Sequence, residues 1–422
     1  MSVSSLSIAL PFPLQLLPEP AYLVGGAVRD WLLGRMLGPV RDVDLVLERG
    51  AVECASDLAR HLDGGFVVLD AKRHIARIVL DDATIDIAQQ AGPTVEVDLQ
   101  RRDFTCNAVA YELHSDRWID PLDGRRDIRD RCLRVVHPEN LTADPLRLLR
   151  GYRQAAQLGF MLANSTRKAA IERRHLLAKM AAERVRAELG YMLELGPTGI
   201  EWLQAAWQDG LLQDWLPELQ PSSFAMAGNA VLASAWLCEH HPANYASLNR
   251  PLCDRRTGLA TVLFAVLLLH VPSDSLDGVL RRLKYSRIEQ QWAHKISLHV
   301  PQLLQLLRAE PSRVQLYQFY EAVADCFPAV ALATLAAGGD RDRLRPIILR
   351  YEDPADSLAH QQLLVGGREL IRDLNLKSGP LVGRLLEAIE LAQAAGAIAT
   401  AEEAIAFARD WLDGDRGGSD SR

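Results

Sequence analysis

The sequence has no run of about 18 uninterrupted apolar residues, the length that a helix needs to cross a bilayer. Its first 20 residues are apolar, but they lack a basic start and contain several prolines, which argues against a signal peptide. We therefore expect a protein of the cytoplasm with no membrane segment.

Cysteine is scarce in this chain of 422 residues. No two cysteines form a CxxC pair, and no histidine pair lies near them with the spacing of a zinc site. We interpret all six as reduced, mostly buried thiols: Cys54, Cys106, Cys132, Cys238, Cys253 and Cys326.

A general excess of positive charge is also absent, because the net charge is −7. Between Arg101 and Glu188, however, 18 Lys and Arg face 12 Asp and Glu, a local +6 that leaves −13 on the rest of the chain. This asymmetry fits a basic phosphate-binding face on an acidic molecule. An ordinary solvated helix surface rich in arginine explains the same count.

The length predicts two to four domains, and a hydrophobic content of 49% is ample for their cores. Residues 21–136 contain short stretches rich in Val, Ile and Tyr that predict strands, with helical spacing at 26–34 and 51–64. From about Asp144 the pattern changes to amphipathic helices with short connections. We predict the α+β class: a mixed sheet flanked by helices, followed by helical domains and a disordered tail.

Two aspartates separated by one valine, in the stretch DVDLVLE, are the first candidate for chemistry. Side chains alternate along a strand, so Asp42 and Asp44 share one face. Like charges on one face repel, and Mg²⁺ bound by one or two carboxylates and substrate phosphates would relieve that repulsion. Metal ions held in this way activate a hydroxyl and neutralise a departing pyrophosphate. A polar edge strand is the alternative.

A glycine pair precedes these aspartates, between a predicted strand and a predicted helix. Gly25 and Gly26 allow close approach of the backbone, and N–H groups at a helix start attract anions. Arg29 lies one turn into the helix. The stretch lacks the lysine of a GxxxxGK[ST] loop. Glycine pair, arginine and DxD within about 20 residues together predict a phosphate site.

These motifs resemble the signature of class II tRNA nucleotidyltransferases, the CCA-adding enzymes, and of the bacterial poly(A) polymerases similar to them. Further stretches resemble that family's later motifs in the same order: RRDFTCNAVA at 101–110, DPLRLLRGYRQAAQLGF at 144–160, ERVRAEL at 183–189 and the region from LLVGGREL at 363–370 onward. The resemblance implies a nucleotidyltransferase head at 1–138, a helical neck at 139–220, a body at 221–350 and a tRNA-binding tail at 351–412, before a disordered end at 413–422.

The resemblance also assigns roles. Asp86, on a strand-like stretch, would lie near Asp42 and Asp44 and would act as a base toward the RNA 3′ hydroxyl. It implies that Arg102, Asp103 and Asn107 contact the ribose and phosphates of the nucleotide. A surface carboxylate and a charged turn are the alternatives for these two sets.

Asp144 and Arg147 lie three residues apart and share a helix face. The resemblance implies that they read the edge of cytosine or adenine, with Arg donating and Asp accepting. Asp144 before Pro145 also fits a helix N-cap. Ala143 stands where the family usually has Glu. Arg150 and Arg153 continue the helix and would meet triphosphate or tRNA, or form a solvated face.

The resemblance implies an enzyme that adds C, A or both to the 3′ end of tRNA from CTP and ATP, with Mg²⁺ and without a protein partner. The segment between Asp86 and Arg101 is short for an enzyme that completes CCA, which points to partial addition, either CC only or A only. Poly(A) polymerase is the nearest alternative activity. An RNA-binding protein without catalysis is the alternative from another class.

Overall fold

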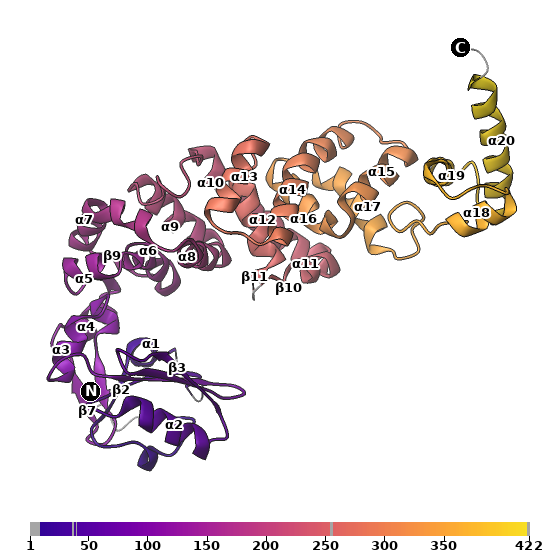
Figure 1. The fold of residues 1–422 in the computed structure, drawn as a ribbon. Coiled ribbons are helices and arrows are strands. Elements are labelled where there is room, and N and C mark those ends of the chain that lie inside the picture. Colours follow the sequence, from indigo (N-terminus) through magenta and orange to yellow (C-terminus); the bar gives the residue numbers. More distant parts are fainter. Residues whose placement is uncertain (1–8, 36–37, 39, 254–255, 420–422) are drawn as a thin grey trace. The chain divides into compact units, whose positions relative to one another are not determined.

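The computed structural model describes residues 9–35, 38, 40–253 and 256–419. The chain divides into two compact units, Met1–Pro217 and Glu218–Arg422. The first holds a sheet with helices and the second is helical almost throughout (Figure 1). The α+β class is therefore confirmed. The division between the units falls close to the expected end of the neck at residue 220.

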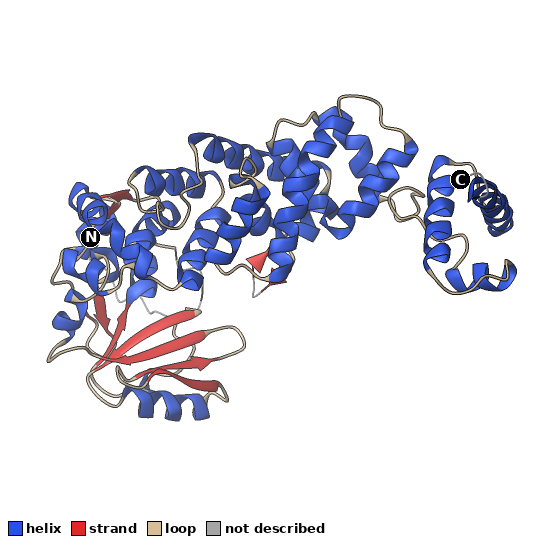
Figure 2. Cartoon of the chain, turned by 45° about the horizontal axis from the view of Figure 1, so that its top comes forward, coloured by secondary structure: helices blue, strands red, loops and turns tan. Residues whose placement is uncertain are grey.

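The first unit is built on a seven-stranded mixed sheet, drawn in red in Figure 2. Its strand order is β3-β4-β5-β2-β1-β6-β7, in which β2 and β5 run parallel and every other neighbouring pair runs antiparallel. The strands are β1 (Ala21–Val24), β2 (Asp42–Leu47), β3 (Gly65–Asp70), β4 (Ile75–Val79), β5 (Thr84–Gln89), β6 (Ala110–Glu112) and β7 (Arg117–Ile119).

Alternation along β2 places its side chains in two layers. Val43, Leu45 and Leu47 belong to a core that also contains residues of α1 (Gly25–Leu32) and α2 (Ala51–His61). Val46 belongs to a second core, on the opposite face, which includes residues of α3 (Val95–Gln100). Asp42 and Asp44 therefore project from the same face as Val46, at the beginning of the strand.

After the head the first unit becomes helical. Gly151 of α6 allows this helix to lie close to Phe104, because a Cβ atom at position 151 would be 3.1 Å from the phenylalanine ring. The remaining elements of this unit are α4 (Gly124–Arg129), β8 (Cys132–Leu133), α5 (Pro138–Ala143), α6 (Leu146–Leu158), β9 (Met161–Leu162), α7 (Asn164–Arg173), α8 (Ala182–Glu194) and α9 (Pro197–Gln208).

The second unit contains helices and one small hairpin. The stretch Arg313–Ala336 has the length and hydropathy of a membrane span, but 78% of its most apolar window is buried within the fold, as in a core helix. The elements are α10 (Pro221–His240), α11 (Pro242–Leu248), β10 (Pro251–Cys253), β11 (Arg256–Thr257), α12 (Gly258–Leu267), α13 (Ser273–Arg282), α14 (Arg287–Leu306), α15 (Arg313–Val323), α16 (Phe327–Ala336), α17 (Arg341–Glu352), α18 (Gly367–Asp373), α19 (Pro380–Ala395) and α20 (Ala401–Ser419).

Some elements differ from the sequence-based expectation. The short elements β7, α3 and α4 were not anticipated, because three to six residues carry too little periodicity to be recognised. Helix α20 continues to Ser419, into a segment for which the composition predicts disorder, and residues 420–422 lie outside the described residues.

Candidate active site

The glycine turn lies against one of the paired aspartates. Gly25 begins α1 directly after β1, with φ +73°, a conformation that favours glycine. A Cβ atom on Gly25 would lie 2.7 Å from Oδ2 of Asp44 and 3.4 Å from Nη1 of Arg102. The absence of a side chain thus lets a backbone, a carboxylate and a guanidinium converge.

Three carboxylates gather on one face of the sheet. Asp42 and Asp44 lie two residues apart on β2, and the register with parallel β5 places Asp86 beside Asp44. Asp42 accepts a hydrogen bond of 2.7 Å from the Thr84 hydroxyl. The structure therefore brings the three predicted aspartates together, although they come from two strands about 40 residues apart.

Asp86 is already paired with a cation. Arg77 lies directly across from it on β4, and its Nε and Nη2 each donate to one carboxylate oxygen of Asp86 at 2.7 Å. This bidentate pair neutralises the third negative charge. Asp42 and Asp44 remain as the carboxylates that face the cleft.

The surroundings of Asp44 disfavour its charged form. Burial raises the pKa of Asp44, and the neighbouring charges of Asp86 and Asp42 raise it further, against the opposing effect of Arg102 and Arg77. Among the described residues, no three His, Cys, Asp or Glu side chains form a complete metal cage. Two carboxylates that also need substrate oxygens fit Mg²⁺, which seldom takes an all-protein cage.

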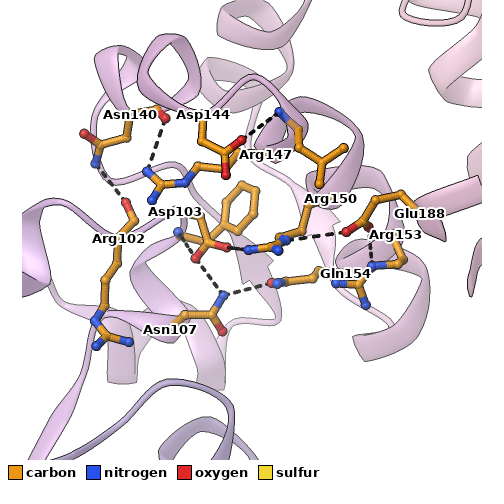
Figure 3. Close-up of polar contacts among 12 residues, drawn as sticks. Arg102, Asp103, Asn107, Asn140, Asp144, Arg147, Arg150, Arg153, Gln154 and Glu188 are labelled. Carbon is orange, nitrogen blue, oxygen red and sulfur yellow. Dashed lines mark hydrogen bonds and ion pairs between the residues drawn. The ribbon is translucent and has the colours of Figure 1, made fainter. Parts of the chain in front are cut away.

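A network of buried polar side chains joins the head to α6 (Figure 3). The Asn107 amide donates at 2.9 Å both to Asp103 and to Gln154 of α6, and its oxygen accepts from Nη1 of Arg29 at 2.8 Å. Asp103 also accepts from the backbone N–H of Phe104 at 2.8 Å. Arg29, Asp103 and Asn107, three of the predicted nucleotide-binding residues, are thus held together by hydrogen bonds. Arg29 also faces the cleft.

Asn140, in the first turn of α5, connects that network to the predicted base-reading pair. Its amide donates at 2.8 Å to the carbonyl oxygens of Gln100 and Arg102. Arg147 donates from Nη1 to the carbonyl oxygens of Arg101 at 3.0 Å and of Asn140 at 3.2 Å. The Arg147 guanidinium is therefore held through Nη1 by two backbone carbonyl oxygens, and Figure 3 shows the bond to Asn140.

Asp144 lies between α5 and α6 rather than within a helix. Its Oδ1 accepts from the backbone N–H of Leu146 at 3.3 Å, a weak form of the predicted capping contact. Its Oδ2 is 3.1 Å from Nη2 of Arg184 on α8. Asp144 thus has a cation partner from the ERVRAEL stretch.

Arg150 and Arg153 both turn to one buried glutamate. Arg150 lies 3.5 Å from Asp103 and 3.7 Å from Glu188, and Nε of Arg153 donates to Glu188 at 2.5 Å. Glu188 is only 4% exposed. In this state Arg150 and Arg153 brace α6 against α8, whereas the sequence predicts that they meet the triphosphate or RNA.

An open cleft of about 490 Å³ lies at this site. Its wall contains the glycine turn, both aspartates of β2 and the end of α6: Gly26, Ala27, Arg29, Asp30, Arg35, Gly38, Val40, Arg41, Asp42, Asp44, Gln157 and Leu158. The cleft is lined mainly by polar groups, as a nucleotide site requires.

Comparison with known proteins identifies the family of this chain. Residues 21–134 match the family model "Poly A polymerase head domain", residues 159–222 match "Probable RNA and SrmB- binding site of polymerase A", and residues 258–408 match domain 2 of tRNA nucleotidyltransferase. A CC-adding tRNA nucleotidyltransferase of Synechocystis sp. is 42% identical over 406 residues, which cover 95% of this chain and 96% of that protein. The chain belongs to the tRNA nucleotidyltransferase family.

Other members of this nucleotidyltransferase family support the assignment. A CC-adding enzyme of Thermus thermophilus is 32% identical over 94% of this chain and 95% of its own length. A solved structure, the Thermotoga maritima CCA-adding enzyme complexed with tRNA, superposes with a TM-score of 0.68 at 26% identity, covering 93% of this chain and 91% of that chain. The resemblance found in the motifs therefore extends over the whole nucleotidyltransferase.

Several residues of the nucleotidyltransferase site carry no sequence signal of their own. Arg77 and Asn140 each contact a predicted site residue, yet lie outside the motifs from which the site was predicted. Gln154 contacts Asn107 and lies within the 144–160 stretch, but no role was predicted for it. Arg77 faces Asp86 because of the register between β4 and β5. That register cannot be read residue by residue from one sequence, so this pair was not predicted. Glu188 lies in the ERVRAEL stretch, and the structure shows that it contacts Arg150 and Arg153.

Proposed function

We propose that this nucleotidyltransferase adds two cytidines to the 3′ end of tRNA, with CTP as donor and release of pyrophosphate. The observation that carries the proposal is the 42% identity, over 95% of the chain, to the CC-adding enzyme of Synechocystis. The relative of Thermus thermophilus carries the same name. ATP is the second nucleotide to test, because members of this family differ in whether they add the final A.

The connection between β5 and α3 supports partial addition. It consists of residues 90–94 alone. The backbone N–H of Ala91 donates to Asp98 at 3.0 Å, and the Gln90 amide donates to the Pro93 carbonyl at 3.1 Å. These two bonds hold a short segment in place, whereas the resemblance implies a longer charged segment here in enzymes that complete CCA.

The chemical step follows from the carboxylates of β2. Mg²⁺ bound at Asp42 and Asp44 would lower the pKa of the attacking hydroxyl and neutralise charge on the departing pyrophosphate. The backbone at Gly25 and Gly26 would cradle the phosphates at the start of α1. Asp86 would assist as a base through the lone pairs that Arg77 leaves free.

The reading of the base is proposed for Asp144 and Arg147. Arg147 keeps donors besides the one bound to backbone, and these would donate to the cytosine ring, while Asp144 would accept from the exocyclic amine. Arg102, Asp103 and Asn107 would contact the ribose and phosphates. The helical body at 221–350 and the tail at 351–412 would bind the tRNA through its backbone and shape. The enzyme would act in the cytoplasm and without a protein partner.

The test is the length of the product. The enzyme is incubated with a tRNA that lacks its CCA end, with Mg²⁺ and with CTP alone, ATP alone or both. The proposal predicts two added residues with CTP, and no further growth when ATP is also present. Growth by three residues with both nucleotides would indicate CCA addition, and long tails with ATP alone would indicate a poly(A) polymerase. Asp42→Asn should bind the tRNA but add nothing.

A further inference from the structure

An exposed aromatic ring stands beside the active-site cleft. Tyr191 lies on α8 and is 55% exposed. The Arg153 guanidinium carbon lies over this ring, 5.6 Å from its centroid. The ring therefore combines open surface with a cation held against it, an arrangement that favours stacking.

Contacts of Arg153 connect the ring to the cleft. Besides Nε, which binds Glu188, Arg153 donates from Nη1 to Oε1 of Gln157 at 2.8 Å. Gln157 lines the same cleft as Asp42 and Asp44. Tyr191 is thus one side chain removed from the cleft wall, and all of these residues lie in the first compact unit.

A buried carboxylate, that of Glu188, holds the cation that lies over the Tyr191 ring. Glu188 is three residues before Tyr191 on α8, so both project from the same side of the helix. Because Glu188 is buried and holds Arg153, the cation that lies over the ring is held in place without a ligand. A pre-positioned surface loses less entropy when it binds.

We propose that Tyr191 is a stacking platform for the base of the unpaired 3′-terminal nucleotide of the RNA acceptor. This inference rests on the proposed function for the existence of that acceptor. A single-stranded RNA end exposes its base faces, and stacking on an aromatic ring accepts any base. The platform would hold the terminal base at the mouth of the cleft while its 3′ hydroxyl points toward Asp42 and Asp44.

The test compares Tyr191→Ala and Tyr191→Phe, with Phe66→Ala as the matched control. Phe66 is an exposed ring on β3, 41% accessible and remote from the network described above. Dissociation constants are measured for an RNA hairpin that carries an unpaired 3′ nucleotide and for the same hairpin with an abasic 3′ residue. Loss of one stacked base should weaken binding about ten-fold or more.

The proposal predicts that Tyr191→Ala binds the complete hairpin about ten-fold more weakly, whereas Tyr191→Phe and Phe66→Ala bind it as the unmodified enzyme does. With the abasic hairpin, the unmodified enzyme should show the same loss and Tyr191→Ala no further loss. An equal loss for Tyr191→Ala on both hairpins, or none on either, would overturn the platform.

Binding is measured without nucleotide, so the result does not depend on which nucleotide is added. If the product assay shows no extension of any tRNA while the binding pattern holds, the proposed reaction fails and the platform stands. If extension occurs as proposed and the binding pattern is absent, the platform alone is wrong. The KM for CTP should be unchanged in all three variants.

Discussion

Arg77 grips Asp86 through both carboxylate oxygens, from the position directly opposite on the neighbouring strand. Because Asp86 lies beside Asp44 across the β2–β5 pair, this cation also affects Asp44. Arg77 therefore fixes the orientation of the Asp86 carboxylate and lowers the pKa of Asp44. Its place on the sheet makes Arg77 part of the site, although it does not line the cleft.

The first prediction concerns pH. The charge of Arg77 lowers the pKa of Asp44, so Arg77→Leu should raise that pKa further above its ordinary value. A protonated Asp44 cannot bind Mg²⁺, and activity is lost as pH falls through its pKa. The acid limb of the kcat/KM profile for CTP should consequently move to higher pH, with activity largely restored in alkaline buffer. The exposed Arg73, on the turn after β3, offers the control Arg73→Leu, which should leave the profile in place.

The second prediction concerns the glycine turn. Gly25→Ala would place Cβ 2.7 Å from the Asp44 carboxylate and impose positive φ on a residue that disfavours it. Incorporation of CMP should fall by about 100-fold or more, since misplacement of about 1 Å has costs of this size. Gly190→Ala is the control, because a Cβ atom there meets nothing within 4 Å and the position is helical. Normal activity in Gly25→Ala would contradict the proposed phosphate cradle.

The motifs predicted which residues would lie together at the starts of α1 and β2, because each motif depends on local geometry. Alternation along a strand places Asp42 and Asp44 on one face whatever the rest of the fold does. A glycine pair between strand and helix permits the positive φ that the turn at Gly25 requires. Residues such as Arg77 and Asn140 act across distances that only strand register and helix packing define. The contacts of Arg77 and Asn140 depend on the tertiary structure, and no short sequence pattern encodes them.

The third prediction concerns stability without metal. The raised pKa of Asp44 means that its ionisation destabilises the folded state as pH rises through that pKa, while below the ordinary carboxylate pKa this cost is absent. Asp44→Asn should therefore stabilise the protein in EDTA at pH 7 by about 1 kcal/mol, the usual size for relieving a functional site. The gain should shrink toward pH 4. Thermal unfolding followed by fluorescence measures both values.

Added Mg²⁺ separates this effect from simple repacking. Unmodified enzyme should gain thermal stability with Mg²⁺, since a ligand that binds only the folded state stabilises it, and Asp44→Asn should gain much less. Equal stabilisation of both proteins would place the bound metal away from Asp44.

The last prediction concerns Asn140, whose amide holds the carbonyl oxygens of Gln100 and Arg102 while its own carbonyl receives Arg147. Asn140→Ala removes two hydrogen bonds of about 1 kcal/mol each, and should raise the KM for CTP about ten-fold or more. Because Arg147 is proposed to read the base, misincorporation of UMP should also rise. Affinity for the RNA acceptor should stay unchanged, since the bonds that are lost orient the nucleotide side of the site.

Asn229→Ala, which removes an amide donor to the Ala336 carbonyl in the second unit, is the control and should leave the KM for CTP unaltered. A loss of RNA affinity in Asn140→Ala with an unchanged KM for CTP would show that this asparagine supports the acceptor and not the base-reading pair.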